Sequence, residues 1–155
     1  MKKKTVAILL IAVLVTTLLA GCSKRTQISS QEFHDTMEAK GFEMTDATEQ
    51  FDEVESLKKV WVAVSEDEGY QIEFYEMEDE DFARGSFEIN KARFEEQEAQ
   101  SQMKFSVTTR TYAKYTLHAN GKIMIVSQIG NTMMYANADD RYLEDIEKIV
   151  SEFGY

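Results

Sequence analysis

The sequence predicts an α+β fold in two layers, in which amphipathic helices cover one face of an antiparallel sheet of about five strands. Three observations lead to this prediction. Three segments repeat apolar residues at helical spacing, residues 104–118 alternate at strand spacing, and Asn120-Gly121 and Gly130-Asn131 mark tight turns between short strands. The predicted order is αββαβββα, which needs no parallel crossover connection.

The first predicted helix covers residues 31–40. Ser29 and Glu32 have the spacing of a capping box, in which each side chain binds a free backbone N–H of the first turn. Phe33 and Met37 are four residues apart and therefore share one face. Gly41 follows the helix, because glycine adopts the positive φ of a helix end without strain.

A hairpin and a second helix come next. Residues 57–65 and 70–77 are rich in aromatic and β-branched side chains, and the four residues between them predict a loop. The acids at 79–81 precede a helix to about Gln97, since negative charge stabilises the unpaired N–H groups of a first turn. The apolar stripe of this helix includes Ala83, Phe87 and Phe94.

The C-terminal half predicts a meander of three strands and a last helix. Residues 104–118 alternate as one long half-buried strand, which reverses at Asn120-Gly121 into 122–129. Gly130-Asn131 then turns the chain into 132–136. A helix over 139–153 follows, with apolar residues on one face and Gly154 at its end; these residues are Leu143, Ile146, Ile149, Val150 and Phe153.

The chain opens with an export segment. Lys2, Lys3 and Lys4 precede an apolar run that stays free of charge until Lys24, which is the layout of a signal peptide over residues 1–21. At about 1.5 Å per residue, Thr5–Ala20 spans only about 24 Å, less than the roughly 30 Å hydrocarbon core of a bilayer. The lysines favour retention of the N-terminus in the cytoplasm, so the remainder is expected outside the membrane.

The apolar run ends in Leu19, Ala20, Gly21 and Cys22, which resemble the lipobox of bacterial lipoproteins at all four positions. The resemblance implies that the Cys22 sulfur receives a diacylglyceryl group. It also implies that Leu19, Ala20 and Gly21 are recognised by the lipoprotein signal peptidase, which leaves Cys22 as the new N-terminus. Because two acyl chains anchor a protein stably, the expected location is the outer face of the cytoplasmic membrane, with that membrane as a partner.

The expected mature chain is strongly acidic. Without residues 1–21 it keeps 14 of the 17 Lys and Arg against all 28 Asp and Glu, a net charge of −14. Residues 22–30 comprise the lipidated cysteine and a stretch without apolar periodicity, which predicts a flexible tether. Residues 31–155 suit a single domain. Cys22 is the only cysteine, so this domain has no disulfide.

One segment departs from the acidic background. Residues 101–138 contain four cations and no acid. Arg110, Tyr112, Lys114 and His118 fall on the outward face of the predicted long strand, and a face that combines an aromatic ring with cations can bind anionic ligands or sugars. The structural alternative is that these cations pair across strands with the acids of 70–77.

No enzyme signature is present. The only cysteine is assigned to the lipid, and His34 and His118 are not in a recognised metal-ligand spacing, so no catalytic residue, metal or cofactor is predicted. The negative charge and external location argue against nucleic acid as a partner.

The leading hypothesis is a lipid-anchored binding or interaction module that contacts an envelope protein or polymer. The alternatives are an extracytoplasmic enzyme that uses scattered carboxylates or histidines, and a structural envelope protein. Convergence of His34, His118 or two carboxylates in one pocket would favour the enzyme.

Overall fold

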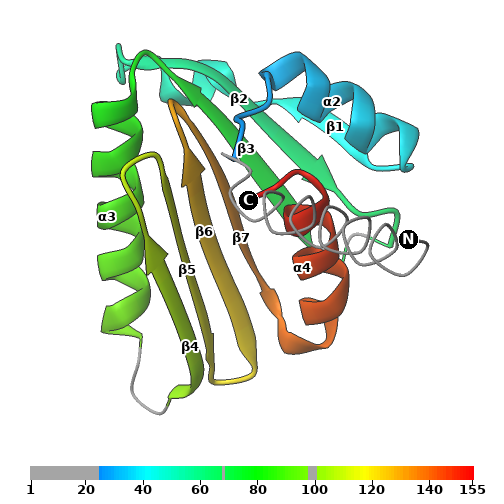
Figure 1. Ribbon diagram of the computed structural model, residues 1–155. Coiled ribbons are helices and arrows are strands. Elements are labelled where there is room, and N and C mark those ends of the chain that lie inside the picture. Colours follow the sequence, from blue (N-terminus) through cyan, green and yellow to red (C-terminus); the bar gives the residue numbers. More distant parts are fainter. Residues whose placement is uncertain (1–24, 68, 98–100) are drawn as a thin grey trace, which may run out of the picture.

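A computed structural model describes residues 25–67, 69–97 and 101–155 as an α+β fold built on one antiparallel sheet of seven strands (Figure 1). The expected signal peptide and the lipobox residues Leu19, Ala20, Gly21 and Cys22 lie outside the described residues. Within the described part of the chain, no helix is long and apolar enough to span a membrane.

The elements follow the order αβββαββββα when the short 3-10 turns are left aside. The helices are α2 (Ser30–Ala39), α3 (Glu80–Glu96) and α4 (Leu143–Glu152), and the 3-10 turns are η2 (Thr48–Phe51) and η3 (Asp140–Tyr142). The strands are β1 (Glu43–Asp46), β2 (Leu57–Val64), β3 (Gln71–Met77), β4 (Ser101–Thr108), β5 (Tyr112–Ala119), β6 (Lys122–Ile129) and β7 (Thr132–Asp139). In space their order is β1-β2-β3-β7-β6-β5-β4, and all neighbours are antiparallel.

The α+β class is confirmed, but the expected five strands and the expected element order along the chain, αββαβββα, are wrong. The structure adds β1, a four-residue edge strand that pairs with β2 and lacks a periodic apolar pattern. It also divides 104–118 into β4 and β5. The turn between them carries no Gly, Pro or Asn signal. Instead, the Thr109 hydroxyl accepts a bond from the Tyr112 N–H at 3.2 Å and donates to the Tyr112 carbonyl at 3.1 Å.

The turn at Thr109 also changes which residues share a face. Phe105 pairs with Thr116 and Val107 with Lys114, and partners in an antiparallel pair project to the same side of the sheet. Uninterrupted alternation would instead place Phe105 and Val107 with Tyr115 on one inner face. In the structure Tyr115 belongs to the opposite face.

The prediction that the helices cover only one face is wrong, because the sheet lies between two helical layers. One core cluster joins α2 and α4 to one face through residues that include Ile123 and Ile125 of β6. A second cluster joins α3 to the other face through residues that include Met124 of β6. Figure 1 shows α3 on one side of the sheet and α2 and α4 on the other. The fold therefore has three layers.

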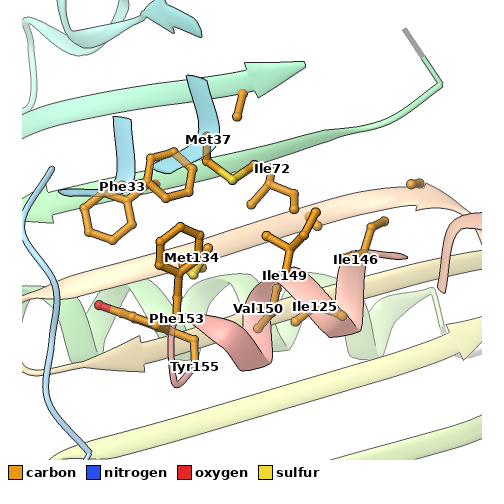
Figure 2. Packing of buried hydrophobic residues seen from close by; sticks show 14 of the residues in the cluster. Phe33, Met37, Ile72, Ile125, Met134, Ile146, Ile149, Val150, Phe153 and Tyr155 are labelled. Carbon is orange, nitrogen blue, oxygen red and sulfur yellow. The ribbon is translucent and has the colours of Figure 1, made fainter. Parts of the chain in front are cut away.

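The first cluster is packed by side chains from both of its helices. Figure 2 shows Phe33 and Met37 of α2 and the apolar face of α4 meeting over strand residues such as Ile72 and Met134. The Phe33 ring stacks on Phe74 with centroids 4.9 Å apart. Aromatic pairs of this kind contribute about 0.5–1.5 kcal/mol beyond the burial of their area.

The predicted caps at the start of α2 and α3 and the glycines after α2 and α4 are confirmed, whereas the start of the last helix at Asp139 is wrong, because η3 comes first and α4 begins at Leu143. The Ser29 side chain accepts a bond from the Glu32 N–H at 3.1 Å, and Asp79 accepts one from the Phe82 N–H at 2.8 Å. Gly41 and Gly154 follow α2 and α4 with positive φ angles of 89° and 85°. These local signals act within one turn of chain, so they do not depend on which face of the sheet a helix covers.

Candidate functional site

The segment just before α2 is fixed to the body of the protein, which contradicts the flexible tether expected there. Arg25 donates to the carbonyl of Gly154, and its guanidinium lies over the Tyr112 ring, 4.1 Å from the centroid. Gln27 donates to the Asn131 side chain at 2.7 Å and accepts from the Asn131 N–H at 3.1 Å. Ile28 packs against the first core cluster. Residues 25–29 therefore belong to the folded domain.

Arg25 lies at the rim of a cleft between β4, β5 and the end of α4. We call this the tether cleft. Its volume is about 500 Å³, and it is lined by Arg25, Phe105, Val107, Thr109, Tyr112, Lys114, Ser151 and Tyr155. Two residues of the predicted ligand surface, Tyr112 and Lys114, lie in this cleft. Tyr112 was expected to be exposed, yet it is only 6% exposed because Arg25 and the first core cluster cover it.

The two cations of the tether cleft hold the chain end that follows α4. Lys114 donates to the main-chain oxygen of Tyr155 at 3.3 Å, next to the bond from Arg25 to Gly154. Burial lowers the pKa of Lys114, Arg25 acts in the same direction, and Glu147 opposes it. Cations near the C-terminal end of a helix also interact favourably with its dipole. Both side chains therefore have a structural role as well as a charge to offer a ligand.

The other two predicted residues lie outside the tether cleft. Arg110 is exposed in the turn between β4 and β5, and the Nε2 atom of His118 lies 3.2 Å from Asp140 at the opposite end of β5. The proposed pairing with the acids of β3 is wrong, because β7 and β6 separate β3 from β5. Among the described residues, no carboxylate forms a salt bridge with Arg110 or Lys114.

A second cleft lies at the N-terminal end of β3, where α2 ends and α4 begins. We call it the ring cleft. Its volume is about 540 Å³, and it is lined by Lys40, Gly41, Phe42, Ser65, Glu66, Asp67, Tyr70, Tyr142 and Asp145. Tyr70 lies between two other rings, with its centroid 5.0 Å from that of Tyr142 and 5.9 Å from that of Phe42.

The ring cleft is electronegative as well as aromatic. Lys40 is the one cation of the lining, and its charge is offset by an ion pair with Glu152 at 2.7 Å. Glu66, Asp67 and Asp145 also line the cleft and leave it with a net negative charge. Bonds from the Ser65 hydroxyl and then the Gly69 N–H lower the pKa of Asp67. Arg141 already lies over the Tyr142 ring, 4.7 Å from its centroid. Aromatic faces beside carboxylates attract cations, so the cleft suits an ammonium group.

The sequence did not reveal the ring cleft, because its residues come from three separate segments of the chain, 40–42, 65–70 and 142–145. Gly69 is a partial signal. A Cβ at this position would lie 2.0 Å from the Tyr142 hydroxyl, so glycine is required for Tyr142 to reach the loop between β2 and β3. That requirement becomes visible only when the loop and the turn before α4 are placed together.

The histidines do not converge on either cleft, whereas carboxylates do share the ring cleft. His34 contacts Asp35 at 3.0 Å and lies against Trp61, whereas His118 contacts Asp140, and neither histidine lines the tether cleft or the ring cleft. Three carboxylates, those of Glu66, Asp67 and Asp145, line the ring cleft. However, the pKa of Asp67 is lowered, the opposite direction from that of a general acid at neutral pH. In the described residues, no group of three or more His, Cys, Asp or Glu could hold a metal ion.

Comparison of the chain with protein-family models, curated proteins and solved structures found no match.

Proposed function

We propose that the chain is a bacterial lipoprotein that works as a binding module at the outer face of the cytoplasmic membrane, anchored by lipid on Cys22. The observation that carries the proposal is the run Leu19-Ala20-Gly21-Cys22 after an uncharged apolar segment with three N-terminal lysines. The fixed position of Arg25 supports it, since the folded domain begins only three residues after the cysteine that would carry the lipid.

The binding site of this module is the ring cleft, and its ligand carries an alkylammonium group, such as the lysine side chain of an envelope protein. Three rings and the carboxylates of Asp67 and Asp145 supply complementary faces and charge. A cation over an aromatic face gains about 0.5–1 kcal/mol when exposed and about 2 kcal/mol when desolvated. The net charge of −14 expected after cleavage favours a cationic partner.

Metabolic labelling with a fatty acid tests the anchor. The parent chain should take up label and fractionate with the membrane, whereas Cys22→Ser should remain uncut and unlabelled, because no other residue offers a thiol. Label that persists on the Cys22→Ser protein would refute the anchor. Parent protein that fractionates with the cytoplasm would refute export.

Binding of tetramethylammonium and of a lysine-rich peptide, followed by calorimetry, tests the ring cleft. Tyr70→Ala or Asp145→Asn should weaken binding about 2- to 30-fold, which corresponds to about 0.5–2 kcal/mol. Glu144→Gln is the matched control, because Glu144 is exposed on α4 beside Asp145 but does not line the cleft. Equal losses in all three variants would indicate a diffuse charge effect and exclude a site at these rings.

A further inference from the structure

The edge strand β4 leaves apolar side chains uncovered on the face that carries α2 and α4. Phe105 is 53% exposed and Met103 is 63% exposed, and they pair with Thr116 and His118 of β5. Val107, two residues further along, is partly buried on the same side. Soluble surfaces do expose single apolar residues, but a row along an outer strand indicates a contact surface.

The row continues into the tether cleft. Phe105 and Val107 line that cleft together with Arg25, so the apolar row and the beginning of the folded domain share one surface. The bond from Arg25 to Gly154 and its stacking on Tyr112 fix this arrangement. The path of the chain before Arg25 therefore starts beside the row.

The distance from Arg25 to the lipid is short. Arg25 follows Cys22 by three positions, and a fully extended chain covers at most about 11 Å over three such steps. This step rests on the proposed lipidation of Cys22. The headgroup region of each leaflet is about 5–7 Å deep. A reach of about 11 Å therefore keeps the surface around Arg25 at the headgroups or no more than about one headgroup depth beyond them.

This surface carries less negative charge than the rest of the protein, so it is better suited to contact an anionic bilayer. Arg25 and Lys114 lie in the cleft, and the segment 101–138, which includes β4 and β5, contains no acid. The acids near it include Glu80, which lines a neighbouring hollow with Arg25, Glu147, which acts on Lys114, and Glu32 and Glu76, which act on Tyr155. Each Lys or Arg near an anionic leaflet contributes about 1 kcal/mol to membrane attraction.

We propose that Met103, Phe105 and Val107, with Arg25 and Lys114, form a membrane-contact surface that rests on the headgroup layer of the bilayer holding the Cys22 lipid. In this orientation β4 faces the membrane. The ring cleft lies beside β3, and β7, β6 and β5 separate β3 from β4, which is about 19 Å at about 4.8 Å between neighbouring strands. A second copy of the chain is the competing occupant of an exposed edge strand, and the experiment separates the two.

Site-directed spin labelling of the lipidated protein in vesicles tests the orientation. Lipid consumes the thiol of Cys22, the only cysteine, so an engineered cysteine takes the label alone. The labelled positions are Phe105→Cys and Met103→Cys, and the matched control is Ile89→Cys. Ile89 is 56% exposed on α3, on the opposite face of the sheet. The vesicles contain phosphatidylcholine with or without phosphatidylglycerol, and collisions with oxygen and with a water-soluble nickel complex report depth.

The ratio of oxygen to nickel collisions should be severalfold higher at 103 and 105 than at 89, and higher with phosphatidylglycerol than without it. Equal ratios at all three positions would overturn the proposal. Protection from both reagents, with dipolar broadening between labels, would overturn it in favour of self-association. Failure of lipidation is distinguishable, because the label would then also react with a free Cys22 thiol and the protein would not remain on the vesicles.

Discussion

Replacing Phe87 by alanine tests whether α3 packs on the face of the sheet opposite α2 and α4, an arrangement that the sequence did not predict. Phe87 lies in the middle of α3, is fully buried, and belongs to the second core cluster with residues such as Tyr115 and Met124. Truncation removes a buried ring and leaves a cavity that neighbours on a paired sheet cannot fill. We therefore expect the free energy of unfolding to fall by about 3–5 kcal/mol.

The expected loss is large compared with the stability of an ordinary domain. Small domains unfold with a free energy of about 5–15 kcal/mol, so the variant should be marginal. For a domain of this size, each kcal/mol shifts the thermal midpoint by about 4 °C, which predicts a decrease of about 12–20 °C. Ile89→Ala is the control on the same helix. Because Ile89 is 56% exposed, its truncation should change the free energy of unfolding by no more than about 0.5 kcal/mol.

Urea unfolding of the lipid-free chain that starts at Ser23, monitored by fluorescence of Trp61, measures both variants. Parallel transitions with equal slopes show that the change lies in the folded state and not in the compactness of the unfolded chain. If Phe87→Ala is as stable as the parent, or if Ile89→Ala is the costlier variant, then α3 does not pack on the sheet through this face.

Three further predictions concern the Asp46 carboxylate, the Tyr155 hydroxyl and the cysteine content of the chain. The bond from Lys59, and then those from Thr48, lower the pKa of Asp46 to about 2, so this stabilisation is present above about pH 4 and is lost as pH falls towards 2. Asp46→Asn should therefore show a smaller loss of stability in an acid titration than the exposed control Asp52→Asn. Burial raises the pKa of Tyr155 to about 12, so its contribution is present below about pH 10 and is lost as pH rises through 12. Tyr155→Phe should reduce the alkaline loss of stability, and an unchanged alkaline transition would contradict the burial of this hydroxyl. A reducing agent should leave the thermal midpoint of the lipid-free chain that starts at Ser23 unchanged, because this chain contains no cysteine and therefore no disulfide, and a shift in calorimetry would contradict this prediction.

The positions of the two clefts predict how the proposed lipoprotein would be oriented on the membrane. If Cys22 carries lipid as proposed, Arg25 would place the tether cleft near it, whereas the ring cleft lies beside β3, which β7, β6 and β5 separate from β4. A ligand in the ring cleft would therefore be held on the side away from the membrane. The proposed orientation rests on the contacts that fix residues 25–29 to the domain, those of Arg25 with Gly154 and of Gln27 with Asn131.

Local signals in the sequence determined the helices and most of the strands. Ser29, Asp79, Gly41 and Gly154 act within a few residues of their own backbone, so their effect is independent of the remaining fold. Asn120 and Gly121 likewise have the positive φ angles, 55° and 73°, that their turn requires. The lipobox resemblance is also local, and it remains a prediction about residues 19–22.

Tertiary structure decided the facing of the sheet and the position of both clefts. A continuous apolar strand such as β6 is buried on both faces, and this run was the signal for a third layer. Alternation through 104–118 concealed the turn at Thr109, because side-chain bonds to Tyr112 replace the usual turn residues. Arg25, Tyr70 and Tyr142 have no distinctive pattern in the chain. They become part of a site only through contacts with residues far away in sequence, and hydrophobic packing of the whole sheet, a non-directional force, sets those contacts.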